Sequence, residues 1–312
     1  MPDNPARFYT RLPEGAVRCD LCPRRCVITP GGAGWCRMRC NAAGELHALS
    51  YARPAAVAID PIEKKPLMNF LPGTRTLSLG AFGCNLDCCF CQNSSLSHGT
   101  YNANGDWRIL TPRETVSLAA ANDCPSISLT YNEPTLWIEY AMDIAKLARA
   151  SGLRTVLVTN GFIEPEPARA LYPLVDAANI DVKGFSEEFY ESMCGGSLAP
   201  VRTACEIFKN EAGGHLELTN LVIPGRNDSP EQQEAYLDWV EAALGTEGDL
   251  VGGLPPQGDL DALAAGDLAL AVADVLGDLV TSLSVTHHAD AGVGGHAGGQ
   301  TEVGLLSAVG NH

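Results

Sequence analysis

The chain has 312 residues, of which 46% are hydrophobic, and its formal net charge is −16. This length suits one large α/β domain with a small additional segment, and the acidic balance disfavours non-specific binding to nucleic acids. The acidity belongs mainly to the C-terminal part, because the last basic residue is Arg226 whereas acidic residues continue to Glu302.

Cysteine content and the N-terminal sequence indicate a compartment. The first residues lack the charged and then apolar pattern of a secretory signal peptide, and no apolar run reaches the length of a membrane span. Twelve cysteines in such a chain indicate metal ligation rather than disulfides. We therefore expect a cytoplasmic, oxygen-sensitive protein with no membrane partner.

Residues 1–50 form a cysteine-rich head. Its cysteines follow the spacing C-x2-C-x3-C-x9-C, given by Cys19, Cys22, Cys26 and Cys36, with Cys40 as a spare. Glycines between the last two ligand candidates allow the tight turns that a metal site needs. The pattern predicts a metal-binding knuckle that holds either zinc or a second iron–sulfur cluster; the alternative is a loop with free thiols.

After a connecting segment at 51–73, strand-like and helix-like runs alternate over residues 74–248. The predicted strands are 76–82, 126–130, 154–159, 178–182 and 216–222. The predicted helices are 113–122, 135–150, 165–173, 186–192, 200–211 and 230–244. This alternation predicts βαβ units around a parallel sheet, and five such units favour an α/β fold with a partial TIM-like barrel.

The most informative motif directly follows the first of these strands. Cys84, Cys88 and Cys91 have the spacing C-x3-C-x2-C. A [4Fe–4S] cluster normally takes four cysteines, so three leave one iron with an open position for a cofactor or substrate, as in catalytic metal sites. The alternatives are a zinc site, although zinc usually takes four ligands, the remnant of a disulfide, and a chance grouping of cysteines. Cys89 breaks the spacing and is expected to be a bystander.

Polar residues follow the other strands at the edge where parallel sheets bind ligands. These candidate cofactor-binding residues are Asn132, Glu133, Thr159, Asn160, Asp181 and Lys183. Asp181 and Lys183 share one side of their strand, because side chains alternate with period two. A structural ion pair between them is the alternative.

These motifs resemble the radical S-adenosylmethionine (SAM) superfamily. Residues 74–244 are similar to its activating-enzyme branch, typified by pyruvate formate-lyase-activating enzyme, with Tyr-Asn-Glu-Pro at 131–134 in the place of Gly-Gly-Glu-Pro. Over residues 15–244 the closer likeness is to the AmmeMemoRadiSam-system radical SAM enzymes, which share the cysteine-rich head and Asp-Pro-Ile-Glu-Lys-Lys-Pro-Leu at 60–67.

The resemblance implies an activity and its partners. A [4Fe–4S] cluster on the three-cysteine motif would reductively cleave SAM to a 5′-deoxyadenosyl radical, which abstracts hydrogen from an unknown substrate. The electron donor would be a flavodoxin or ferredoxin, and the substrate could be a protein. Glycyl-radical activation is one candidate reaction, weakened by Tyr131-Asn132 in place of Gly-Gly. Lys64 and Lys65 either bind an anionic substrate or form a solvated pair, and we favour the solvated pair.

Residues 249–312 depart from the family pattern. They form an acidic stretch rich in Gly and Ala, expected to be disordered or to come from a shifted reading frame, with one amphipathic helix at 260–280. If the reading frame is shifted, the sixth strand that closes related barrels would be missing and catalysis would be impaired. Two rival interpretations follow: a non-catalytic iron–sulfur or zinc protein, or a decayed radical SAM protein.

Overall fold

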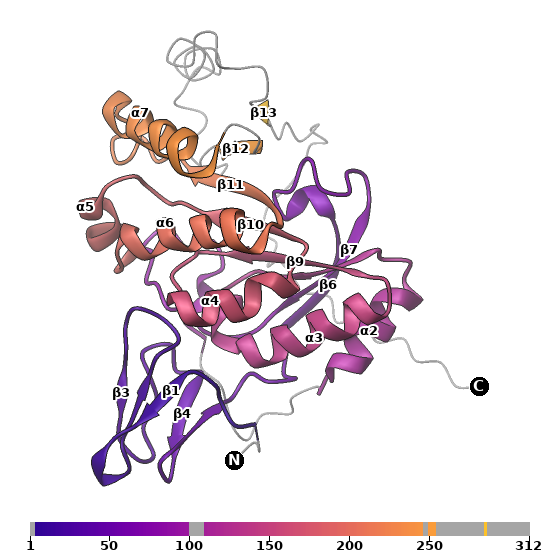
Figure 1. Ribbon diagram of the computed structural model, residues 1–312, viewed down its shortest axis with the longest axis vertical. Coiled ribbons are helices and arrows are strands. Elements are labelled where there is room, and N and C mark those ends of the chain that lie inside the picture. Colours follow the sequence, from indigo (N-terminus) through magenta and orange to yellow (C-terminus); the bar gives the residue numbers. More distant parts are fainter. Residues whose placement is uncertain (1–3, 100–108, 246–248, 254–283, 286–312) are drawn as a thin grey trace, which may run out of the picture.

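The computed structural model describes residues 4–99, 109–245, 249–253 and 284–285. The helix expected at 260–280, and most of the C-terminal segment, lie outside these residues. In the described part of the chain, no helix combines the length and apolarity needed to cross a bilayer. Two structural units are present, a small N-terminal β head and a large α/β unit (Figure 1).

The head is built from two small antiparallel sheets. The first contains β1 (Tyr9–Arg11), β2 (Val17–Cys19) and β3 (Val27–Ile28), with a 3-10 turn at Pro13–Gly15. The second is the hairpin of β4 (Arg39–Ala42) and β5 (Glu45–Ala48). Leu21 and Leu46 of the head are fully buried and belong to the same apolar core as the large unit. The head is therefore packed continuously onto the rest of the protein.

One eight-stranded sheet forms the centre of the large unit, in the order β13-β12-β11-β10-β9-β8-β7-β6. The strands are β6 (Ala56–Pro61), β7 (Arg75–Gly80), β8 (Ser126–Leu129), β9 (Arg154–Thr159), β10 (Ala177–Asp181), β11 (His215–Leu221), β12 (Asp249–Gly253) and β13 (Ser284–Val285). Among the described strands of this sheet, only β6 runs antiparallel to its neighbour, and β7 to β13 are parallel. The predicted α/β class with a parallel sheet is confirmed, and the sheet is open.

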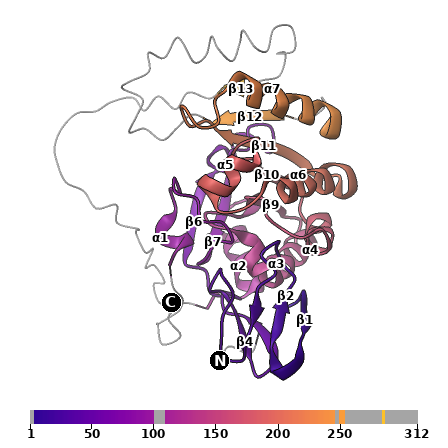
Figure 2. The ribbon, with the colours of Figure 1, turned by 90° about the vertical axis from the view of Figure 1, so that its left-hand side faces the viewer.

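The helices follow the strands as the alternation predicts. They are α1 (Ser94–Ser97), α2 (Pro112–Ala121), α3 (Ile138–Ala150), α4 (Pro165–Leu171), α5 (Glu187–Phe189), α6 (Leu198–Glu206) and α7 (Pro230–Trp239). Short 3-10 turns lie at Ile62–Lys64, Pro134–Trp137 and Tyr172–Leu174, and single π turns at Tyr190–Cys194, Ile207–Ala212 and Val240–Leu244. The helices α3, α4 and α6 lie on the same side of the sheet (Figure 2).

Alternation along the strands gives the sheet two unlike faces. Leu77 and Leu79 of β7 belong to the apolar core that includes residues of α2 and α3. On the opposite face of β7, Thr76 Oγ1 lies 2.7 Å from Ser128 Oγ of β8. The face away from the helices is therefore lined by hydroxyl groups near β7 and β8, which suits a polar ligand.

Two expectations from the sequence are wrong. Residues 56–61, within the expected connecting segment, form β6. In the turn that follows, Lys65 is not solvated as expected: its side chain is only 2% exposed and its Nζ lies 2.6 Å from Asp60 Oδ2, so only Lys64 is solvated. In addition, residues 249–253 pair in parallel with β11 as β12, so a sixth parallel strand is present. Neither could be read locally, because each depends on partners far along the chain.

Candidate functional site

The three cysteines of the C-x3-C-x2-C motif lie on the loop that follows β7, at the C-terminal end of the parallel strands. Cys84, Cys88 and Cys91 are partly buried, whereas Cys89 is exposed. The side-chain amide nitrogen of Asn160, Nδ2, lies 3.6 Å from Cys84 Sγ. Burial raises the pKa of the Cys84 thiol to about 12. Metal ligation would therefore have to displace a firmly held proton.

Asn132 braces the start of this loop. Its Oδ1 accepts from the backbone N–H of Ala81 at 3.1 Å, and its Nδ2 donates to the carbonyl of Gly83 at 2.6 Å. Gly83 has a φ of +89°, which favours glycine, and a Cβ there would lie 2.7 Å from the carbonyl oxygen of Cys36. The amide of Asn132 is thus engaged with the cysteine loop itself.

Glu133 joins the ends of β8 and β9. Its carboxylate is fully buried and accepts from Thr159 Oγ1 at 2.8 Å, from the N–H of Asn160 at 2.8 Å and from the N–H of Thr135 at 2.9 Å. Burial raises the pKa of Glu133, although these donors oppose the rise. The structure therefore brings Glu133, Thr159 and Asn160 together, as expected, but the hydrogen bonds between them point to a supporting role.

Asn160 links this network to the cysteine loop. Its Nδ2 donates to Asn85 Oδ1 at 2.9 Å, and Asn85 Nδ2 donates to the carbonyl of Phe162 at 2.6 Å. Asn85 is completely buried and directly follows Cys84 in the chain. Nothing in the local sequence around Asn85 indicated this role. The loop carrying the cysteines is therefore held from the ends of both β8 and β9.

Asp181, the last residue of β10, and Lys183, two residues later, form an ion pair at the C-terminal edge of the sheet. Lys183 Nζ lies 2.9 Å from Asp181 Oδ2, and the side chains are 16% and 33% exposed. Burial alone would lower the pKa of Lys183, but the charge of Asp181 and the hydrogen bond to it raise this pKa overall. The ion pair considered from the sequence is present, and it lies at the C-terminal end of β10.

Cys194 is a neighbour of the motif that sequence reasoning missed. It is completely buried, and a hydrogen bond between the Cys194 and Cys88 side chains, followed by burial, raises the pKa of Cys88. The backbone carbonyl of Cys194 also accepts from the N–H of Asp87 at 2.8 Å. Cys194 lies more than 100 residues from the motif, so no spacing rule could have connected them.

Tyr131 has a left-handed backbone with a φ of +73°, which is a strained conformation for a bulky residue. Its hydroxyl donates to Asp60 Oδ2 at 2.6 Å, and Lys65 Nζ lies 4.4 Å from its ring centroid. Its ring also packs against Gly80, where a Cβ would come within 2.8 Å of it. The backbone at Tyr131 therefore has the conformation that a glycine would adopt, and Asp60, Lys65 and Gly80 hold it there.

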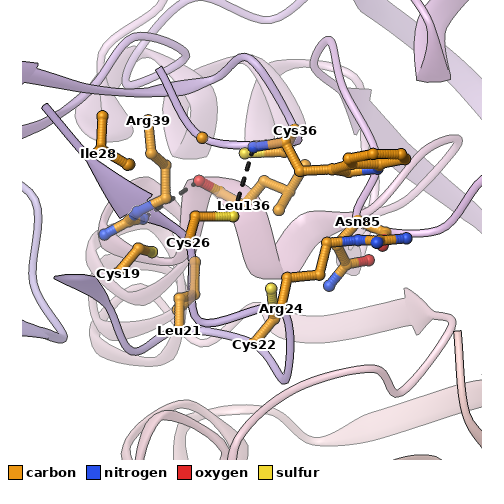
Figure 3. A pocket seen from close by; sticks show the side chains of 12 residues that line it. Cys19, Leu21, Cys22, Arg24, Cys26, Ile28, Cys36, Arg39, Asn85 and Leu136 are labelled. Atoms are coloured by element: carbon orange, nitrogen blue, oxygen red, sulfur yellow. Dashed lines mark hydrogen bonds between the residues drawn. The ribbon is translucent and has the colours of Figure 1, made fainter. Parts of the chain in front are cut away.

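The four predicted ligands of the head line one small cavity (Figure 3). Cys19, Cys22, Cys26 and Cys36 approach it from different segments of the head, and Asn85 of the cysteine loop forms part of its wall. In the described residues, no three Cys, His or acidic side chains converge tightly enough to share a single ion. The structure thus gathers these thiols around one space without fixing the metal.

The donor set on the cysteine loop fits an iron–sulfur cluster with an open position. Each thiolate of such a cluster binds a different iron, so the three thiols need not converge on one ion. All twelve cysteines are free thiols, and Lys183 supplies a positive charge that complements an anionic cluster. Cys84, Cys88 and Cys91 would hold the cluster.

Comparisons with known proteins agree with this site. The model of the radical SAM superfamily matches residues 80–237. The chain is 42% identical over 242 residues to the uncharacterized protein MJ0808 of Methanocaldococcus jannaschii, covering 78% of this chain and 71% of that protein. A 7-carboxy-7-deazaguanine synthase of Methanothermobacter thermautotrophicus is 30% identical over 130 residues, which cover 41% of this chain and 49% of the synthase.

A solved structure supports the same fold. A radical SAM methyltransferase from Sphaerobacter thermophilus has a TM-score of 0.50 and 17% sequence identity, covering 70% of this chain and 67% of the methyltransferase. At this identity the likeness concerns the fold alone. The match of the family model over half of the chain, together with the three-cysteine loop at the end of β7, shows that the chain belongs to the radical SAM superfamily.

Proposed function

We propose that the chain holds a [4Fe–4S] cluster on Cys84, Cys88 and Cys91 and uses it with SAM to abstract a hydrogen atom from its substrate. The observation that carries the proposal is the three-cysteine loop at the C-terminal edge of the parallel strands, where Asn160 Nδ2 lies 3.6 Å from Cys84 Sγ. When bound, the cluster supplies one electron for cleavage of SAM into methionine and a 5′-deoxyadenosyl radical, which takes the hydrogen atom.

The predicted SAM-contacting residues divide into two groups. Lys183 and Asp181 are partly exposed, so SAM can reach them, and we assign them the carboxylate and the ribose hydroxyls of SAM. Glu133 and Thr159 are buried and hydrogen-bonded to one another, so we propose that they hold the ends of β8 and β9 in position and do not contact SAM. Asn132 is assigned the positioning of the cysteine loop.

For the reaction class, we place the chain nearer to the AmmeMemoRadiSam-system enzymes than to glycyl-radical activators. The shared segment at 60–67 supports this, because Asp60 and Lys65 contact Tyr131, the residue that replaces the first Gly of the activating-enzyme motif. The segment at 60–67 and the Tyr-Asn-Glu-Pro motif at 131–134 are thus in direct contact. We further propose a flavodoxin or ferredoxin as electron donor and a cytoplasmic location, which the free thiols support.

The test is product analysis under anaerobic conditions. The chain is reconstituted with iron and sulfide, reduced with dithionite and incubated with SAM, and 5′-deoxyadenosine is measured by chromatography. Cys88→Ala should abolish the product. The matched control is Cys89→Ala, which removes an adjacent but exposed thiol and should leave the product unchanged.

Two outcomes would count against the proposal. Iron and sulfide content that is the same in the parent chain and in Cys88→Ala would mean that the motif holds no cluster. A cluster that forms but gives neither a spectral change nor 5′-deoxyadenosine on addition of SAM would favour an electron carrier or an inactive family member.

A further inference from the structure

The cavity in the head has features of a second metal centre. Its volume is about 10 Å³, roughly the space of one water-sized sphere. Four free thiols line it, and Gly34 lets one wall lie close to Ile28, since a Cβ there would come within 3.3 Å of Ile28 Cδ1. A small space bounded by four thiols is the donor environment that thiophilic metals select.

A buried cation also lines this cavity. The side chain of Arg39 is 1% exposed, and its Nε is buried without a hydrogen-bond partner among the described residues. Its terminal nitrogens are already used by Glu139, so Nε is the donor that remains. Four thiolates around a metal carry a net negative charge, and an unpaired N–H of a guanidinium beside them would complement it.

The loops that carry the head cysteines also contact the loop of the Cys84–Cys91 motif. Arg24, between the second and third head cysteines, donates from Nε to the carbonyl of Asn85 and from Nη2 to the carbonyl of Gly195, both at 2.6 Å. Its guanidinium lies 4.2 Å from the ring centroid of Trp35, the residue before Cys36. Metal ligation by the head cysteines would therefore fix Arg24 against the loop that carries Cys84.

We propose that Cys19, Cys22, Cys26 and Cys36 form a closed, four-thiolate metal centre that anchors the head on the radical SAM loop. Four protein ligands leave no position for substrate, so its role is structural. The shared chemistry is thiolate ligation of a thiophilic metal: either one zinc ion, which would draw the four thiols closer together than they lie in this structure, or an iron–sulfur cluster, in which each thiolate binds a different iron. The inference does not depend on the proposed reaction, because it concerns thiols outside the Cys84–Cys91 loop.

The test measures metal in a chain that cannot hold the first cluster. In the full chain with Cys84→Ala, Cys88→Ala and Cys91→Ala, zinc, iron and acid-labile sulfide are determined after anaerobic purification. We expect about one zinc per chain or, for a cluster, matching iron and sulfide. Adding Cys22→Ser should reduce this metal to background, whereas adding Cys40→Ser, a buried thiol of the head outside the cavity, should not.

A second measurement does not depend on the folding of the Cys22→Ser chain. Chelator-treated triple-alanine protein is titrated with Co²⁺, whose absorption reports tetrahedral thiolate ligation. Thiolate-to-cobalt bands that disappear on adding Zn²⁺, or iron and sulfide that resist chelation, support the centre. The proposal is overturned if the triple-alanine chain retains no metal and takes up no cobalt, or if Cys40→Ser loses metal as fully as Cys22→Ser.

Discussion

Replacement of Glu139 by Gln should destabilise the protein strongly. Glu139 is in α3 and forms a bidentate ion pair with Arg39 of the head, at 2.8 and 3.1 Å. The Arg39 and Glu139 side chains are 1% and 7% exposed. Glu139 also accepts from the backbone N–H of Arg7 at 2.6 Å. The variant keeps the shape of the side chain but leaves a buried guanidinium without its counter-charge.

The expected loss in the free energy of unfolding follows from the burial of the Arg39–Glu139 pair. Removing one partner of a buried ion pair costs about 3–5 kcal/mol, because the remaining charge stays desolvated. The matched control is Glu45→Gln, which breaks the Arg11–Glu45 pair at 2.7 Å, where the side chains are 54–67% exposed. Exposed pairs contribute about 0–1 kcal/mol. Both variants neutralise a carboxylate paired with an arginine at nearly the same distance, but only the Arg39–Glu139 pair is buried and bidentate, so we attribute most of the difference to burial.

Thermal unfolding at fixed metal loading measures the effect. A loss of 3–5 kcal/mol corresponds to a decrease in Tm of about 6–20 °C for a domain of this size, and the Glu45→Gln chain should stay within about 4 °C of the parent. Equal decreases in the two variants would refute the reasoning, since they would mean that water reaches the Arg39–Glu139 pair.

Three further predictions concern the loops around the site. Gly83→Ala should destabilise the chain by about 1–3 kcal/mol, because the new Cβ would meet the carbonyl of Cys36 at 2.7 Å; an unchanged midpoint in denaturant would show that the loop yields freely. Asp60→Asn should cost about 3–5 kcal/mol, since it leaves the buried ammonium of Lys65 unpaired, and recovery in the Asp60→Asn/Lys65→Met double variant is the check. Asn132→Ala removes both side-chain hydrogen bonds to the cysteine loop, so the reconstituted protein should lose iron to a chelator faster than the parent does. The rate should rise roughly tenfold for each 1.4 kcal/mol of stabilisation that the loop loses. An iron-loss rate equal to that of the parent would rule out a bracing role for Asn132.

Local patterns predicted much of the site because the relevant residues are close in the sequence or occupy equivalent places in repeated units. The C-x3-C-x2-C spacing keeps three thiols on one loop, and the strand ends converge because parallel strands share one edge. The period of two correctly put Asp181 and Lys183 side by side. These inferences require only short-range geometry and the βαβ order.

Contacts between distant segments could not be predicted in this way. Cys194 lies beside Cys88, Lys65 is buried against Asp60 and Tyr131, and Arg24 holds the loop of Asn85 only because the folded chain brings these segments together. Solvation of Lys65 was a reasonable expectation from charge alone, since buried lysines require a partner. The sequence by itself determined the three-cysteine motif and the alternating order of strands and helices. Only the tertiary structure decided which polar side chains are buried with a partner, because that burial depends on contacts between segments far apart in the sequence.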